Sequence, residues 1–190
     1  MMKSPLVIFG SGDIAQLAHF YFCGDSDYEV VAFTVDMAYL KEAHFCGLPV
    51  VAFEEITELY PPDQYELFIA LSYSRLNALR KEKYLAAKSL GYRLASYVSS
   101  HATVLNAGQI GDNCFIFEDN TVQPFVNIGN NVTLWSGNHI GHHSTIKDHC
   151  FLASELALKA EAQAQRLGNL KSARIIPGTP AGSLGEREQR

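Results

Sequence analysis

Four of the seven histidines fall within one short segment, as His139, His142, His143 and His149. A neutral imidazole near pH 7 is a natural general base for taking a proton from a hydroxyl or an amine. A metal site is the competing interpretation, but it needs carboxylates or cysteines that converge on the ion, and Asp148 is the one acidic residue at hand. The segment therefore favours proton transfer over metal binding, and solvated turn histidines remain the third alternative.

A second candidate site lies near the N-terminus, where Gly10-x-Gly12 follows the apolar run Leu6–Phe9 and precedes a predicted helix. Glycines allow the backbone to approach a phosphate, and a helix N-terminus offers unpaired N–H groups to it. Asp36 ends the next predicted strand, where an acidic side chain often binds a ribose. Because Ala15 replaces the third glycine of a dinucleotide fingerprint, an NAD-dependent oxidoreductase is not favoured. A nucleotide-type site and a tight turn without a ligand both remain open.

The elements that position the N-terminal candidates alternate between strand and helix over residues 1–97. Such alternation is typical of an α/β domain with a parallel sheet. The predicted strands are Leu6–Phe9, Val30–Val35, Val50–Phe53, Leu67–Leu71 and Tyr92–Val98, and the clearest helix is Arg75–Leu90, which ends at Gly91.

The histidines belong to a different pattern, an aliphatic residue at every sixth position from 98 to 152. Its members are Val98, Val104, Ile110, Ile116, Val122, Ile128, Leu134, Ile140, Ile146 and Leu152. A hexapeptide repeat predicts a parallel β-helix, in which each repeat supplies one short strand and the aliphatic side chain points inward. Ordinary hairpin strands would instead show a period of two. His142 is the third residue of the hexapeptide that starts at Ile140, near a corner of the prism, where it can project between neighbouring subunits.

From about residue 156 the six-residue pattern is expected to stop. Leu156–Leu167 consists of Leu, Ala, Lys, Glu, Gln and Arg, which all have high helix propensity, so we predict a helix there. The remainder of 156–190 is polar and poorly patterned, and we predict that it is disordered. The predicted organisation is thus an α/β domain at 1–97, a β-helix at 98–155 and a tail at 156–190.

Composition narrows the classes of partner. The net charge is −5, and no Lys/Arg-rich run provides a footprint for nucleic acid. No apolar run approaches the length of a membrane span, so no membrane partner is expected. The four scattered cysteines form no CxxC pair, which indicates neither a disulfide framework nor a zinc site and fits a reduced, cytoplasmic compartment.

Together the two halves resemble the sugar O-/N-acyltransferase family typified by sialic acid O-acetyltransferases and by bacillosamine and perosamine N-acetyltransferases. The residues that carry the resemblance are Val7-Ile8-Phe9-Gly10-Ser11-Gly12, Phe33-Thr34-Val35-Asp36, Phe68-Ile69-Ala70-Leu71, Gly91-Tyr92 and the hexapeptides through His149-Cys150-Phe151-Leu152-Ala153-Ser154. The resemblance implies a small Rossmann-like domain fused to a left-handed β-helix.

The resemblance also implies roles. Gly10, Gly12 and Asp36 would hold the nucleotide part of a nucleotide-linked sugar. His142 would be the catalytic base, and His143 occupies the place where the family commonly has an acidic residue. Members of the family are homotrimers that bind acetyl-CoA, as co-substrate, in the groove between adjacent β-helices, and their products serve polysaccharide biosynthesis. No metal is implied.

Related chains continue for several more hexapeptides, so the sequence predicts a β-helix truncated at its C-terminal end, as a frameshift would produce. Two functions follow. The first is acetyl-CoA-dependent acetylation of an amine or hydroxyl of a nucleotide-activated sugar or a sialic acid. The alternative is an inactive homologue that binds a nucleotide sugar or only assembles.

Overall fold

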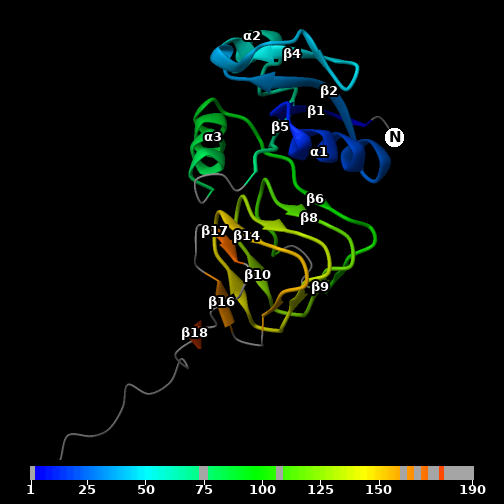
Figure 1. The fold of residues 1–190 in the computed structure, drawn as a ribbon, viewed down its shortest axis with the longest axis vertical. Coiled ribbons are helices and arrows are strands. Elements are labelled where there is room, and N and C mark those ends of the chain that lie inside the picture. The colour runs from blue at the N-terminus through cyan, green and yellow to red at the C-terminus, as the bar shows by residue number, and fades with distance from the viewer. Residues whose placement is uncertain are drawn as a thin grey trace, which may run out of the picture.

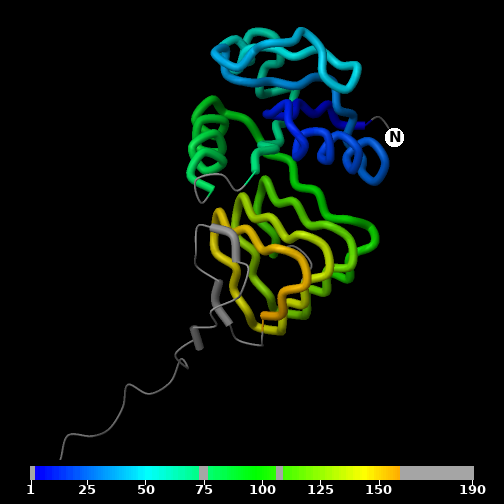
Figure 2. Tube along the Cα trace, viewed as in Figure 1, coloured from blue at the N-terminus to red at the C-terminus, as the bar shows by residue number. Residues whose placement is uncertain are grey.

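The computed structural model describes residues 3–72, 77–105 and 109–158, together with the backbone of three later strands at 162–164, 168–170 and 176–177. Figure 1 shows an α/β part drawn above a stack of coils, and Figure 2 shows the coils winding in one sense along the lower part. Within the described residues no helix has the length and apolar character needed to cross a membrane.

The α/β part is built on a five-stranded sheet in the order β3-β4-β2-β1-β5. Strands β1 (Ser4–Phe9), β2 (Tyr28–Val35), β4 (Leu48–Ala52) and β5 (Glu66–Ile69) are parallel, and β3 (His44–Phe45) runs antiparallel to β4. The chain leaves β1 on one side for β2 and returns on its other side as β5. The predicted α/β class with a parallel sheet is confirmed, and the finer Rossmann-like classification stays a prediction.

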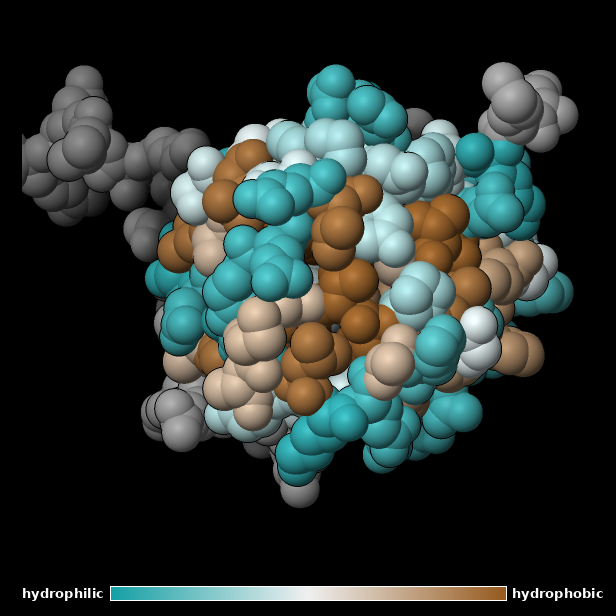
Figure 3. Space-filling model, turned by 90° about the horizontal axis from the view of Figure 1, so that it is seen from above, coloured by the Kyte–Doolittle hydropathy of each residue, from teal (hydrophilic) through white to brown (hydrophobic). Residues whose placement is uncertain are grey.

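Two long helices cover the sheet, α1 (Asp13–Gly24) and α3 (Ala78–Ser89), while α2 (Ile56–Leu59) and the 3-10 turns η1 (Met37–Tyr39) and η2 (Phe53–Glu55) lie in connections. The buried face of α1 carries Ala15, Ala18 and Phe22, at the i, i+3, i+7 spacing of one helical face. The predicted helix at 75–90 is confirmed from residue 78 onward, since 73–76 lie outside the described residues. Seen from above, the α/β part shows an apolar strip through the middle of this face, with polar side chains on both sides of it (Figure 3).

Below the α/β part, short strands recur at six-residue intervals and form three sheets, parallel throughout except at β18. One contains β10-β13-β16-β18, one β17-β14-β11-β8-β6 and one β15-β12-β9-β7. The strands are β6 (Tyr97–Val98), β7 (Thr103–Val104), β8 (Phe115–Ile116), β9 (Thr121–Val122), β10 (Asn127–Ile128), β11 (Thr133–Leu134), β12 (His139–Ile140), β13 (Thr145–Ile146) and β14 (Cys150–Leu152).

The register confirms a parallel β-helix, because paired residues are 18 positions apart in neighbouring coils, as in Phe115 with Thr133 and Ile128 with Ile146. Three hexapeptides therefore make one coil. The aliphatic residues of the repeat are packed inside it, with Ile116, Val122 and Leu134 among those fully buried.

Each coil turns its corners with residues in the left-handed region of φ, and these residues stack 18 positions apart. The first column, here called the α3 corner, contains Asn113, Asn131 and His149; the second contains Asp119, Gly137 and Glu155; the third, here called the histidine corner, contains Phe125 and His143. The repeat thus sets the places of the corner residues as well as those of the core.

The two polar exceptions of the repeat, Asn120 and Asn138, are buried. The Asn120 amide donates to the carbonyls of Phe117 and Trp135, and its oxygen accepts the N–H of Asn138, 3.2 Å away. Asn138 in turn accepts the N–H of Leu156 at 2.9 Å. These amides satisfy backbone groups inside a corner, where an aliphatic residue would leave them unpaired.

The helix predicted over 156–167 is wrong. That segment contains β15 (Ala157–Leu158) and β16 (Ala162–Ala164), and β17 (Gly168–Leu170) and β18 (Ile176–Pro177) follow it. Strands β15, β16 and β17 pair in parallel with β12, β13 and β14 of the preceding coil, and β18 pairs antiparallel to β16. The six-residue pattern therefore continues past 155, because the exposed edges of a coil offer hydrogen bonds that override local helix propensity. Strands β17 and β18 also fall in the part of the tail predicted to be disordered, and residues 171–175 and 178–190 lie outside the described residues.

The two parts of the molecule share a core. Phe115, Phe117, Trp135 and Phe151 project from one sheet of the β-helix, and Phe115 packs on Phe68 at 5.2 Å between ring centroids. Tyr21 of α1 packs on Phe117 at 5.1 Å. An aromatic seam of this kind buries apolar area from both parts, so it fixes α1 and β5 against the first coils.

Candidate active site

His142 and His143 lie side by side at the histidine corner, between β12 and β13. Both are exposed, and their Nδ1 atoms are 2.9 Å apart, with the ring planes almost perpendicular at 89°. In a neutral pair at this distance one Nδ1 must donate a hydrogen and the other must accept it. The predicted catalytic residues are thus brought together on an open surface, where a substrate can reach them.

The preceding coil holds the backbone of this pair. The N–H of His142 donates to Oε1 of Gln123 at 2.8 Å, and the N–H of His143 donates to the carbonyl of Pro124 at 3.3 Å. The ring of Phe125 lies on the His143 imidazole, with 4.7 Å between centroids and 38° between planes. Sequence reasoning missed these three residues, although their positions, 18 to 20 residues before His143, follow from the length of one coil.

The other two histidines of the segment lie elsewhere. His139 begins β12, is exposed, and donates its N–H to the carbonyl of Leu156. His149 belongs to the α3 corner, where it is 8% exposed and its Nδ1 is 2.9 Å from Nδ2 of Asn131. Burial lowers the pKa of His149, which favours the neutral ring. In the part of the chain that the structure describes, no three His, Cys, Asp or Glu side chains are grouped to hold a metal ion.

The two predicted glycines differ in their surroundings. Gly10 has φ +127°, and a Cβ there would lie 2.8 Å from the carbonyl oxygen of Ala70, so packing against the end of β5 requires glycine. Gly12 immediately precedes α1, and a Cβ there would meet nothing within 4 Å. Packing and backbone conformation alone therefore explain a glycine at position 10. At position 12 no packing contact requires glycine, and the start of α1 is left accessible.

Asp36 follows β2 and is bound by a cation from α3. Its Oδ1 lies 2.6 Å from Nζ of Lys83, a side chain only 14% exposed that also sits over the Phe9 and Phe53 rings at 5.7 and 5.9 Å. A cleft of about 270 Å³ opens beside this edge of the sheet, and Ser11, Tyr39 and His44 are among its lining residues. A ribose hydroxyl would have to share the Asp36 carboxylate with Lys83.

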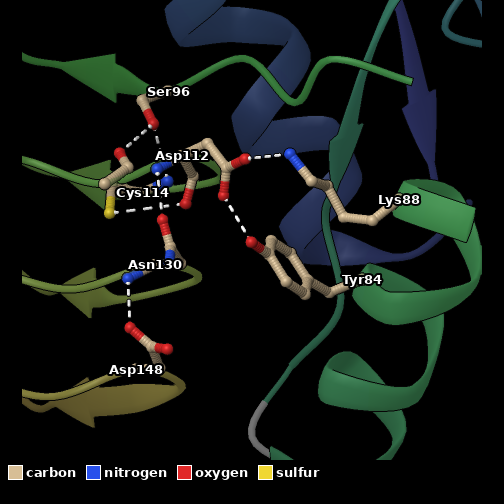
Figure 4. A network of polar contacts seen from close by, with 8 residues as sticks. Tyr84, Lys88, Ser96, Asp112, Cys114, Asn130 and Asp148 are labelled. Carbon is tan, nitrogen blue, oxygen red and sulfur yellow. Dashed lines mark hydrogen bonds and ion pairs between the residues drawn. The ribbon is translucent and has the colours of Figure 1, made fainter. Parts of the chain in front are cut away.

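Helix α3 packs at the other end of β10 and β13, where the chain leaves these strands towards the α3 corner. Asp112 accepts from the Tyr84 hydroxyl at 2.6 Å and pairs with Lys88 at 2.7 Å, and the N–H of Asp112 donates to Oδ1 of Asn130. The bond from a backbone N–H to the side chain 18 residues later recurs in the next coil, where the N–H of Asn130 donates to Oδ1 of Asp148 at 2.7 Å (Figure 4). Burial and the bond to Asp112 raise the pKa of Tyr84, so its phenol stays protonated as the donor. This network fastens α3 to the coils at the α3 corner, whereas His142 and His143 at the histidine corner are exposed.

Comparison with solved structures identifies the architecture. No family model matches the sequence, and neither does any curated protein. The acetyltransferase domain of PglB from Neisseria gonorrhoeae FA1090 superimposes with a TM-score of 0.59 at 14% identity, over 92% of this chain and 100% of that one. WeeI from Acinetobacter baumannii AYE gives a TM-score of 0.66 at 16% identity, over 83% and 73%. This chain has the fold of these proteins.

A third structure extends the comparison to a ternary complex. PerB from Caulobacter crescentus, in complex with CoA and GDP-perosamine, gives a TM-score of 0.54 at 17% identity, over 84% of each chain. The PglB domain has also been solved with acetyl coenzyme A. The structural neighbours thus include an acetyltransferase domain solved with acetyl coenzyme A and a perosamine N-acetyltransferase solved with CoA and GDP-perosamine, in line with the predicted family resemblance.

Proposed function

We propose that this protein is an acetyl-CoA-dependent acetyltransferase that acts on an amine or hydroxyl of a nucleotide-activated sugar or a sialic acid. The observation that carries the proposal is the His142–His143 pair on an exposed corner of a fold shared with sugar N-acetyltransferases. Neighbours with acetyl coenzyme A, CoA and GDP-perosamine in their complexes support the classes of co-substrate and acceptor.

In the proposed reaction, Nε2 of His142 takes the proton of the acceptor amine or hydroxyl as that atom attacks the thioester carbonyl of acetyl-CoA. The new N–C or O–C bond forms, the C–S bond breaks, and the imidazolium returns the proton to the departing thiolate. For Nε2 to be free at the start, Nδ1 of His142 must carry the hydrogen and donate it to Nδ1 of His143. A backbone N–H of a neighbouring coil is suited to hold the oxyanion that develops.

The remaining assignments belong to the same proposal. Gly12 and Asp36, with Gly10 shaping the turn, would bind the nucleotide part of the acceptor at the carboxyl edge of the α/β sheet, in a Rossmann-like domain. The β-helix would be left-handed and the protein a homotrimer, with acetyl-CoA bound between adjacent subunits. The protein would work in the cytoplasm, in polysaccharide biosynthesis.

The test is a thiol-release assay with acetyl-CoA and a panel of nucleotide-activated amino sugars, neutral sugars and sialic acids. His142→Ala should lower turnover by about 10²–10⁴-fold, the usual contribution of a general base. His139→Ala is the matched control, since His139 is exposed in the same coil, and it should keep wild-type turnover. Wild-type turnover in His142→Ala would refute the base assignment.

Thermal-shift measurements separate this function from the inactive alternative. Stabilisation by acetyl-CoA and by a nucleotide sugar supports the enzyme, because a ligand that binds only the folded state raises the melting temperature. Stabilisation by the sugar nucleotide alone, with no thiol release from any acceptor, would instead support a binding protein.

A further inference from the structure

Phe125 has a conformation that is costly for its side chain. It turns the corner before β10 with φ +65°, in the left-handed region that bulky residues avoid. Its side chain is 65% exposed, so hydrophobic burial offsets little of the conformational strain. At the other two corners the left-handed residues are Asn, Asp, His, Glu or Gly, types that tolerate the conformation better or carry polar groups. Another interaction must therefore favour phenylalanine here.

That interaction is with the candidate catalytic pair. Phe125 stands one coil before His143, which also has a left-handed backbone at φ +57°, and the two rings are stacked at 4.7 Å between centroids. The stack occupies one face of the His143 imidazole. The nitrogen Nδ1 of that imidazole is meanwhile engaged with Nδ1 of His142.

The two residues before Phe125 add independent contacts to the same pair. Gln123 accepts the N–H of His142, and the carbonyl of Pro124 accepts the N–H of His143. Proline also fixes its own φ, so the segment that makes these contacts is stiff. Residues 123–125 thus contact both backbones and one ring of the pair.

We propose that Phe125 is a positioning residue for the acetyl transfer proposed above, one that orients His143 so that His143 in turn holds the tautomer of His142. An exposed imidazole has several rotamers, and only some of them point Nδ1 at His142. The Phe125 ring blocks rotation of His143 away from the pair. With His143 fixed as acceptor, His142 keeps its hydrogen on Nδ1 and its lone pair on Nε2, facing the acceptor substrate.

The orientation of His143 matters more because the partner of His142 here is an imidazole and not a carboxylate. A carboxylate attracts an imidazolium at a range of angles, whereas a neutral imidazole acts through one directed hydrogen bond. When His142 takes a proton, the stabilisation that His143 gives depends on that single Nδ1 contact. Loss of the Phe125 ring should therefore reduce turnover without changing how acetyl-CoA binds.

Three substitutions separate the ring from the backbone strain. Phe125→Tyr keeps the ring and should stay within about twofold of wild-type kcat. Phe125→Ala and Phe125→Gly both remove the ring and should lower kcat by about 10- to 100-fold, the scale of a misplaced catalytic group, with KM for acetyl-CoA unchanged. Glycine also relieves the left-handed strain, so Phe125→Gly should melt about 2–4 °C above Phe125→Ala.

A spectroscopic readout makes the inference independent of turnover. Nitrogen NMR of ¹⁵N-histidine protein should show one Nδ1 that carries a hydrogen and one that is bare for His142 and His143 in the wild type and in Phe125→Tyr. Phe125→Ala should average the two tautomers. If the wild type releases no thiol, the proposed function fails while this pattern still tests the orientation. Wild-type kcat and an intact tautomer pattern in Phe125→Ala would overturn the inference and leave the proposed function standing.

Discussion

Replacing Arg80 with methionine should lower the free energy of unfolding by about 2–5 kcal/mol. Arg80 lies on α3, is 2% exposed, and reaches across two coils of the β-helix. One guanidinium nitrogen donates to Oγ1 of Thr133 at 2.6 Å and to the carbonyl of Asn131 at 3.3 Å, and the other donates to the carbonyl of Asn113 at 3.1 Å. Within the described residues its Nε has no hydrogen-bond partner.

Two effects of opposite sign decide the magnitude. Burial lowers the pKa of Arg80 from its ordinary value to about 10, which at about 1.4 kcal/mol per unit means that holding the charge costs roughly 3 kcal/mol. Hydrogen bonds from a charged donor contribute about 1.5–3 kcal/mol each, so three of them outweigh this cost. Methionine relieves the charge but leaves buried acceptors at Asn113, Asn131 and Thr133 without a donor, and the net change is a loss.

The assay is urea denaturation followed by fluorescence of Trp135, the single tryptophan, whose ring packs 4.4 Å from that of Phe117 at the seam between the two parts. Lys81→Met is the matched control, because Lys81 is the next residue on the helix, is half-buried, and should change the free energy of unfolding by less than about 0.5 kcal/mol. If Arg80→Met is as stable as this control, desolvation of the charge cancels the hydrogen bonds and the reasoning fails.

Two further predictions concern the packing of the coils and the buried phenols. Gly129→Ala should destabilise the protein by about 1–3 kcal/mol, because the new Cβ would lie 2.8 Å from the backbone nitrogen of Asp148. Gly24→Ala is the control: its Cβ would meet nothing within 4 Å, so its free energy of unfolding in the same assay should be close to that of the wild type. Equal stability of these two variants would contradict the packing. Burial raises the pKa of Tyr21, Tyr28 and Tyr92 to about 12. Their contribution to stability is therefore complete below pH 10 and is lost as pH rises from 10 towards 12. Denaturation at pH 9 and at pH 11 should show this loss. If a pH titration of phenolate absorbance finds that all tyrosines ionise near pH 10, the prediction is wrong.

The sequence predicted the β-helix well because its repeat depends on positions that each coil imposes independently. The aliphatic positions and the placement of His142 near a corner follow from counting sixes. The helix predicted over 156–167 failed for a physical reason: composition reports the preference of an isolated segment, whereas the unpaired edge of β12 and β13 binds that segment as strands. Arg80 and its acceptors could not be foreseen, because the contact depends on how α3 docks against two coils.

For Phe125, the repeat length predicts which residue lies beside it in the next coil but not how the two side chains meet. Its distance of 18 residues from His143 was available in the sequence, but its left-handed backbone and its stacked ring were not. The repeat gives a residue its neighbours one coil away. The function of those neighbours depends on which way each side chain leaves the corner.

His143 and His149 carry this point to the chemistry of the site. They are six residues apart, both are histidine, and both turn a corner with left-handed φ. His149 faces α3, where burial lowers its pKa and Asn131 engages its Nδ1, so it serves packing. His143 faces solvent beside His142, where the same geometry leaves an imidazole within reach of a substrate. Equivalent places in the repeat thus differ in role because α3 packs against the corner that follows β13, whereas the corner that precedes β13 is exposed.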